Sequence, residues 1–195
     1  TGGELAMSSG TGIGYLNIGG NFSNTLGSVT AEGAEGEITF NGIYDGVTGM
    51  QIFTSGGEIN GTVNFTVDPG AGLQMASEET VIEGDGMFLL ANGSTLGITS
   101  ADGITLEGDM AGNIQTMARV YDIGANYIYN GTSAQVTGDG MTFDTPANLT
   151  IDNAYGPVML STDVNITGDL TVKSGSVLDL SSWSIGTPAS IMLEC

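Results

Sequence analysis

The stretch Thr62-Val63-Asn64-Phe65-Thr66-Val67, followed directly by Asp68-Pro69-Gly70-Ala71-Gly72, decides the fold class of this chain. In its first part apolar residues alternate with small polar ones, which is the period-two pattern of a strand with one buried face. Its second part is rich in residues that favour tight turns and tolerate positive φ. Similar alternating bursts recur at Glu37–Phe40, Asn148–Ile151 and Asp163–Ile166. The sequence therefore predicts many short strands joined by tight turns.

The composition supports the same fold class. The 195 residues include 33 Gly, and only 12% are charged, whereas soluble domains average about 7% Gly and about 25% charged residues. Apolar residues nowhere repeat at i, i+3, i+4 and i+7 over a dozen positions. Further Gly-rich clusters at Glu83–Gly86, Ala91–Ser94 and Thr137–Gly140 are predicted to be turns. We expect an all-β protein with little or no α-helix.

The charge is strongly one-sided. The chain has 22 acidic residues and two cations, Arg119 and Lys173, which give a formal net charge of -20. Proteins that bind nucleic acid neutralise phosphates with Lys and Arg, and anionic membrane surfaces attract the same residues. No run of about 18 apolar residues is present to form a transmembrane helix. We therefore predict no nucleic-acid partner and no membrane insertion.

Several classes of enzyme site are excluded by residue type. Histidine is absent and Cys195 is the single cysteine, so a Ser-His-Asp triad, a Cys-His dyad and a Cys/His zinc site cannot be built. An internal disulfide is excluded as well, although an unpaired cysteine can cross-link two copies. Because Thr1 is not followed by a basic and apolar leader, we expect a mature product or a piece of one.

Internal repetition favours a solenoid over a sandwich or barrel. Gly3–Thr11 aligns without a gap on Gly168–Ser176, and two shorter phrases also recur: Gly84–Met87 as Gly138–Met141, and Asn60–Thr62 as Asn130–Thr132. We predict a parallel β-helix that covers the whole chain, 1–195, as a single segment of eight to ten coils. Each coil is expected to take roughly 18 to 25 residues, the size class of solenoid repeats. An antiparallel sandwich module strung in tandem is the alternative architecture.

The ends of a solenoid matter for function because they are unpaired strand edges unless a polar cap covers them. Ile191-Met192-Leu193 is apolar, and the chain begins in mid-repeat. We therefore expect no cap and predict that the ends continue into neighbouring copies.

A series of phrases resembles one group of known proteins. The phrases are, in order, Asn17–Ser23, Glu37–Gly42, Phe53–Gly57, Ala91–Ile104, Gly112–Gln115, Gly124–Gly138 and Asn148–Asn153. Together they resemble the long repetitive surface proteins of Bacteroidota and related bacteria, which are commonly exported by the type IX system. The resemblance covers nearly the whole chain and implies an extracellular, β-solenoid-like protein with adhesive or structural use. It implies no catalytic residue, and nothing after Trp183 matches the sorting domain with which that family usually ends.

The acidic residues allow two functional interpretations besides solvated turns. Paired carboxylates can hydrolyse glycosides, and Glu78, Glu79, Glu83 and Asp85 are the candidates, although no aromatic cluster accompanies them. Calcium is the better match because it prefers carboxylate and carbonyl oxygens. However, the chain lacks a recognised calcium loop, and its Asp-Gly or Gly-Asp turns are isolated at Asp85, Asp102, Asp109 and Asp139. We assign no catalytic, cofactor or metal residue, with Ca²⁺ kept as the one cation to consider.

Sequons and aromatic residues complete the candidates. Asn-x-Ser/Thr occurs at Asn21, Asn60, Asn64, Asn92, Asn130, Asn148 and Asn165. A glycan needs an outward face, which Asn92 and Asn130 beside turn glycines could offer, whereas Asn64 and Asn165 are expected within strands. The aromatic residues are expected to stack mainly in the core: Tyr15, Phe22, Phe40, Tyr44, Phe53, Phe65, Phe88, Tyr121, Tyr127, Tyr129, Phe143, Tyr155 and Trp183. Tyr127 and Tyr129 share a strand face and are candidates for an outward binding patch.

These observations lead to one functional expectation and one alternative. We expect a secreted, non-enzymatic segment of an extracellular fibre or adhesin, which joins copies end to end and has surface glycans as a second class of partner. The alternative is a polysaccharide-binding or polysaccharide-cleaving β-helix.

Overall fold

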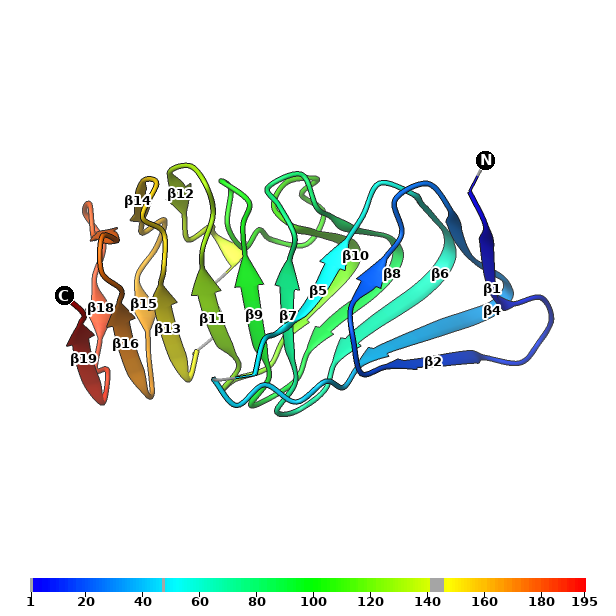
Figure 1. Ribbon diagram of the computed structural model, residues 1–195, viewed down its shortest axis with the longest axis horizontal. Helices are drawn as coiled ribbons and strands as arrows, with labels where there is room; N and C mark the ends of the chain where they lie inside the picture. Colours follow the sequence, from blue (N-terminus) through cyan, green and yellow to red (C-terminus); the bar gives the residue numbers. More distant parts are fainter. Residues whose placement is uncertain (1, 47, 141–145) are drawn as a thin grey trace.

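The computed structural model describes residues 2–46, 48–140 and 146–195 and shows a β-solenoid, which confirms the predicted fold class. Coils stack along one axis from the N-terminal end to the C-terminal end (Figure 1). All strand pairs within the sheets are parallel, and the described residues contain no α-helix. An antiparallel sandwich is excluded because each strand pairs with strands a coil away and not with its neighbour in a hairpin.

One eight-stranded sheet runs through the whole solenoid, and we call it the spine sheet. It contributes one strand to each coil, in agreement with the predicted eight to ten coils. Its strands are, in chain order, β3 (Phe22–Ser23), β5 (Gln51–Thr54), β7 (Gly72–Met75), β9 (Thr95–Ile98), β11 (Asn126–Tyr129), β13 (Asn148–Ile151), β16 (Asp169–Val172) and β19 (Ser190–Leu193).

In residues 2–121, which we call the N-terminal region, a six-stranded sheet lies opposite the spine sheet and completes a wide coil. Its strands are β1 (Glu4–Ser8), β2 (Gly14–Ile18), β4 (Ser28–Phe40), β6 (Glu58–Val67), β8 (Ile82–Leu90) and β10 (Ile114–Tyr121). In the first coil, β1 and β2 pair with the two halves of β4. One long strand therefore spans the width that two short strands cover at the N-terminal end.

The long strands of the six-stranded sheet bend at glycines. Gly33 in β4, Gly61 in β6 and Gly84 in β8 have φ angles of +86°, +74° and +115°, which side-chain-bearing residues rarely adopt. A Cβ on Gly61 would lie 2.0 Å from the carbonyl oxygen of Ala31, so no side chain fits there. The predicted turn at Glu83–Gly86 is therefore wrong, because Gly84 bends β8 without ending it.

Residues 122–195, which we call the C-terminal region, form narrower coils with three faces. The spine sheet supplies the first face. The second is a sheet of β12 (Gln135–Val136), β14 (Pro157–Met159) and β17 (Val177–Asp179), and the third pairs β15 (Val164–Asn165) with β18 (Ile185–Gly186).

Coil length is regular in the C-terminal region and varies in the N-terminal region. The C-terminal spine strands begin at Asn126, Asn148, Asp169 and Ser190, a nearly constant spacing that falls within the predicted coil length. In the N-terminal region the coils from β5 to β7 and from β7 to β9 also fall within the predicted length, because these strands begin at positions 51, 72 and 95. The prediction fails for the first coil, where β3 and β5 begin at positions 22 and 51, and for the coil that contains the 99–113 connection, where β9 and β11 begin at positions 95 and 126.

The core consists of columns of inward side chains that run along the solenoid axis. The register of the spine sheet places one inward residue of each strand from β7 to β19 in a single column: Leu73, Leu96, Tyr127, Leu149, Leu170 and Ile191. A parallel column two residues further along the strands contains Phe22, Phe53, Met75, Ile98, Tyr129, Ile151, Val172 and Leu193. Most members are fully buried, and burial of apolar area contributes about 25 cal/mol per Å².

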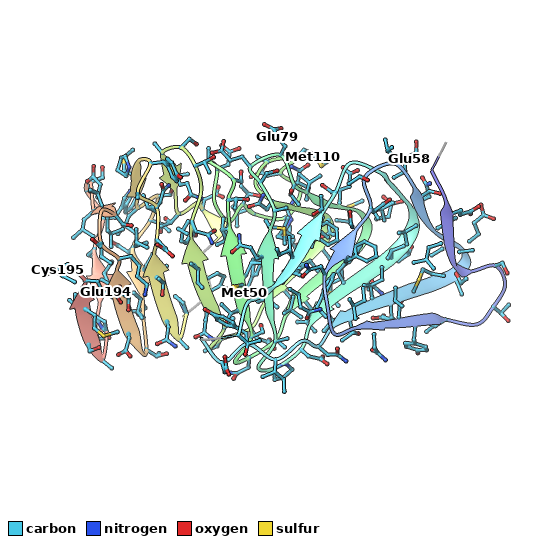
Figure 2. All side chains as sticks on the ribbon, in the orientation of Figure 1. Met50, Glu58, Glu79, Met110, Glu194 and Cys195 are labelled. Atoms are coloured by element: carbon cyan, nitrogen blue, oxygen red, sulfur yellow. The ribbon has the colours of Figure 1, made fainter. Side chains whose placement is uncertain are left out.

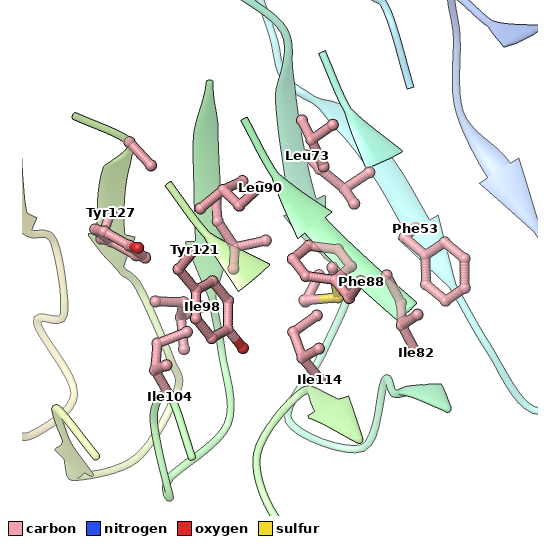
Figure 3. Packing of buried hydrophobic residues seen from close by; sticks show 14 of the residues in the cluster. Phe53, Leu73, Ile82, Phe88, Leu90, Ile98, Ile104, Ile114, Tyr121 and Tyr127 are labelled. Carbon is pink, nitrogen blue, oxygen red and sulfur yellow. The ribbon is translucent and has the colours of Figure 1, made fainter. Parts of the chain in front are cut away.

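Aromatic rings fill the wide part of the core, as predicted for most of them. Phe53 stacks on Phe22 at 5.5 Å between ring centroids and meets Phe40 and Phe65 edge to face at 6.0 and 6.2 Å. Figure 3 shows Phe53, Phe88, Tyr121 and Tyr127 following one another through the core. Exceptions are Tyr15, Tyr155 and Trp183, which are exposed, and Phe143 lies outside the described residues.

The expectation of an outward patch at Tyr127 and Tyr129 is wrong. The two residues do share a face, as strand alternation requires, but that face points into the core and both side chains are buried. The Tyr129 hydroxyl donates a hydrogen bond to the carbonyl oxygen of Thr137 at 2.7 Å. Burial raises the pKa of the Tyr129 phenol well above its ordinary value, because the phenolate would be poorly solvated there.

Buried amides hold successive coils together where the chain turns off the spine sheet. The Gln51 amide donates to the carbonyl oxygens of Ile18 and Gly20, one coil earlier, at 2.7 and 2.6 Å. Gln135 repeats the arrangement with the carbonyl oxygens of Ile98 and Ser100 at 3.1 and 2.9 Å. The carbonyl oxygens of Ile18 and Ile98 also accept backbone amides, from Asn41 and Asn130, so the buried amides add a second hydrogen bond between coils, and such a bond contributes about 1 kcal/mol.

Arg119 lies where the wide coils give way to the three-sided ones. It belongs to β10, the last strand of the six-stranded sheet, and only 7% of its surface is exposed. Its guanidinium donates to the carbonyl oxygens of Thr105, Leu106, Asp109 and Thr116 and to the Thr105 hydroxyl. Arg119 therefore ties the 105–111 loop to the edge of β10, where the next long strand would otherwise pair.

Candidate interaction site at the two end coils

The C-terminal end coil consists of β17, β18 and β19 and presents apolar side chains on one open face. Ile191 and Leu193 are the last members of the two core columns, and they are 61% and 73% exposed, although every preceding member of the Ile191 column is buried. In the described chain β19 pairs with β16 alone, so its other edge carries unpaired backbone groups. Exposed apolar strand edges of this kind are templates for pairing with another strand.

The N-terminal end coil consists of β1, β2 and β3 and is also open. Its inward residues Met7, Leu16, Ile18 and Phe22 pack against the core on one side only and are half-buried. A hollow of about 410 Å³ lies at this end, lined chiefly by residues 2–5 and 22–29. The two ends of the solenoid thus both expose the cross-section of the core, and they face in opposite directions along the axis (Figure 1).

One ion pair lies beside the C-terminal open edge. The Lys173 ammonium contacts the Glu194 carboxylate at 3.0 Å, and it is the one salt bridge among the residues with described positions. The hydrogen bond to Glu194 raises the pKa of Lys173 above its ordinary value. Figure 2 shows Glu194 and Cys195 together at the C-terminal end, where Cys195 is exposed as a free thiol.

The glycosidase candidates come from two elements of the fold. Glu78 and Glu79 lie in a connection beside a hollow of about 280 Å³ that Asp102 also lines, and Glu83 and Asp85 lie on β8. Glu79 and Glu83 both line a second hollow, of about 150 Å³. Hydrogen bonds from Ser133 and Thr132 lower the pKa of Glu78. A glycosidase acid needs the opposite shift, because it must stay protonated to protonate the leaving group.

The calcium candidates also remain separate. Asp85 is on β8, Asp102 and Asp109 are in the 99–113 connection, and the Asp139 carboxylate accepts a hydrogen bond from the Leu106 amide at 3.3 Å. Within residues 2–46, 48–140 and 146–195, no three Asp, Glu, Cys or His side chains come together as metal ligands. The structure therefore offers no assembled cation site in that part of the chain.

The sequons differ widely in exposure. Asn64 in β6 is buried and donates to the carboxylates of Glu35 and Glu37 at 3.0 and 2.9 Å. Asn130, the second residue expected to offer an outward face, is half-buried, and its amide exchanges two hydrogen bonds with Gln74, at 3.1 and 2.6 Å. Asn92 is exposed, as expected, although its amide donates to the Ile123 carbonyl. Asn165 lies in β15, as expected, and is exposed.

In the C-terminal region, Asn and Asp side chains at the starts of successive spine strands form a ladder of hydrogen bonds. Asn126 and Asn148 open successive spine strands, and the Asn148 amide donates to the Asn126 side-chain oxygen at 2.7 Å. The Asn148 oxygen in turn accepts the Asp169 backbone amide at 2.8 Å, and Ser190 donates to the Asp169 carboxylate at 2.6 Å. Sequence reasoning missed this role, although the nearly even spacing of these Asn and Asp residues along the chain was a signal for it.

Comparisons with known proteins found no match, so any functional proposal has to rest on the geometry of this structure. No protein family, curated protein or solved structure matches the chain. No helix in the described part of the chain is long and apolar enough to cross a membrane.

Proposed function

We propose that the chain is a structural, non-enzymatic segment of an extracellular fibre or adhesin that assembles end to end. The observation that supports this proposal most directly is the open C-terminal coil, in which Ile191 and Leu193 end two core columns whose other members are mostly buried. A neighbouring coil stacked on β19 would cover these side chains and pair the free strand edge. The contact would gain about 25 cal/mol per Å² of apolar area removed from water.

The surface charge suggests how such assembly is controlled. With a net charge of -20, copies of the chain repel one another at low ionic strength. Salt screens exposed charges over about 10 Å at 0.1 M, whereas the apolar contact is not weakened by it. Assembly should therefore increase with ionic strength. Together with the resemblance to secreted surface proteins, this charge supports an extracellular setting, with surface glycans as a second class of partner.

A carbohydrate-processing β-helix has weaker support. Such a protein needs a groove with surface aromatic rings and two facing carboxylates. The exposed aromatic residues Tyr15, Tyr155 and Trp183 lie on three separate parts of the chain, and the lowered pKa of Glu78 does not suit the acid of such a pair.

The proposal is tested by introducing charged side chains into the open C-terminal coil. We expect the native chain to form rods and high-mass species in electron microscopy and sedimentation velocity, increasingly so with protein concentration and salt. The double variant Ile191→Asp with Leu193→Asp should remain at the monomer mass of 19.8 kDa, because two carboxylates would be buried at each junction.

A matched control adds the same charge away from the ends. Met110→Asp with Ile123→Asp replaces two exposed residues of central connections, of which Met110 appears in Figure 2. This variant should assemble like the native chain. A native chain that stays at 19.8 kDa at high concentration and high salt, or two double variants that behave alike, would contradict the proposed function.

A further inference from the structure

The two end coils have the same sequence of strands and connections. In the N-terminal coil, β1, β2 and β3 are joined by residues 9–13 and 19–21. In the C-terminal coil, β17, β18 and β19 are joined by residues 180–184 and 187–189. Both coils therefore have one connection of five residues and one of three, and both end in a spine strand. A coil elsewhere in the C-terminal region differs: β14 and β15 are joined by the four residues 160–163.

The core columns show how these coils would be aligned. Phe22 of β3 begins the column that Leu193 of β19 ends, because each strand pair between them is parallel and in register. If the Phe22 of a second copy lay next to the Leu193 of the first copy, the column would continue from one copy into the next in the same register. The chain direction also matches, since every sheet of the solenoid is parallel.

We propose that two copies stack head to tail in one fixed phase, with β1, β2 and β3 of one copy on β17, β18 and β19 of the other. This inference rests on the proposed function and adds to it the rotational alignment of one copy on the next. The Phe22 ring covers Leu193, and Leu5 and Leu16 of the N-terminal coil cover the half-buried Leu178 and Ile185.

The corner between the first two strands supports the same alignment. Trp183 lies in the 180–184 connection and is 43% exposed. The corresponding 9–13 connection contains Gly10 and Gly12, and a Cβ built on either would find no atom within 4 Å. In the proposed phase the bulky indole therefore meets a connection whose glycines leave room for it. The contact is heterologous and does not close on itself, so repetition gives a filament and not a closed ring.

The phase is tested by cysteine cross-linking in a Cys195→Ser background. Ser23 follows Phe22 and Glu194 follows Leu193, so both side chains are exposed and belong to the same outward column. Paired strands lie about 4.8 Å apart, within the Cα separation of about 4.4–6.8 Å that a disulfide needs. We expect chains carrying Ser23→Cys, mixed with chains carrying Glu194→Cys, to give a reducible dimer after mild oxidation. The double variant should give a reducible ladder.

Two controls separate this inference from the proposed function. Asn17→Cys places an equally exposed thiol on β2, another face of the same coil, and it should not cross-link with Glu194→Cys. Rods that cross-link through Asn17→Cys but not through Ser23→Cys would overturn the phase and leave the fibre intact. Dimers of the Glu194→Cys chain alone would overturn head-to-tail stacking. A monomeric chain in sedimentation, with no cross-link in any pair, would overturn both proposals.

Discussion

The N-terminal and C-terminal regions solve the same packing problem in two ways. In the N-terminal region, strands of up to 13 residues bend at glycines and enclose a wide core, which phenylalanine rings fill. In the C-terminal region, strands of two to four residues form three faces, and after the first coil, which still buries Tyr127 and Tyr129, the narrow core consists mainly of Leu, Ile and Val. The comparison shows that the width of a coil and the size of its core side chains vary together, because a protein core must be filled without large voids.

The spine sheet is the structural element that continues through both regions. Its register continues from Phe53 through Ile98 to Ile151 although the opposite side of the coil changes from one bent sheet to two separate ones. Arg119 marks the change, since its hydrogen bonds hold a loop over the edge of β10. Stability in such a solenoid is expected to be a sum of coil and interface terms, so the junction can be tested separately from either region.

The largest effect is expected from emptying the wide core. Phe53→Ala removes a ring that packs on three others and should lower the free energy of unfolding by about 4 kcal/mol, whereas Leu149→Ala in the narrow core should cost about 3 kcal/mol. Urea unfolding followed by circular dichroism measures both. Equal losses, or a larger loss for Leu149→Ala, would show that ring packing is not what distinguishes the wide core.

A somewhat smaller effect is expected at the junction between the regions. Arg119→Met removes the donors to the Thr105, Leu106, Asp109 and Thr116 carbonyls and should cost about 3 kcal/mol. Hydrogen exchange should then show the 105–111 loop and β10 opening before the spine strands. Lys173→Met, which removes the other cation at an exposed site, serves as control and should change stability by about 0.5 kcal/mol or less.

The smallest effect concerns the pH dependence of the Lys173–Glu194 pair. The pKa of Lys173 is raised in the folded chain, so the pair contributes stability below the unfolded pKa and loses it as pH rises through the folded pKa. Both side chains are more than a third exposed, so the contribution is about 0.5 kcal/mol or less and falls with salt. Thermal unfolding of the native chain and of Glu194→Gln should differ at neutral pH and converge at strongly alkaline pH. A difference that persists there would contradict the pair as its source.

Local sequence patterns predicted the elements well where one strand could be judged by itself. Alternation at Thr62–Val67 lies in β6, and Asn148–Ile151 is β13. Turn chemistry was less reliable, since Glu83–Gly86 belongs to β8. A positive-φ glycine permits a turn or a bend, and the strands paired on either side decide which forms. The echo between Gly3–Thr11 and Gly168–Ser176 misled in the same way, because β1 belongs to the six-stranded sheet and β16 to the spine sheet.

The candidate site was predicted in part. The apolar run Ile191–Leu193 was expected to be an uncapped end, and the structure places it in the exposed edge strand β19. The matching architecture of the N-terminal coil could not be predicted, because the pairing of β1 and β2 with one long strand depends on residues of the next coil. Likewise, nothing local distinguishes Asn64, which is buried between two carboxylates, from the exposed Asn165.

The sequence by itself determined that this chain is an all-β protein of many strands joined by turns, because period-two alternation and turn glycines act within a few residues. Only the tertiary structure decided the change from two-sided to three-sided coils, the burial of Arg119, and the inward direction of Tyr127 and Tyr129. The physical reason is that alternation separates two faces of a strand, whereas the neighbouring coils determine which face is removed from water.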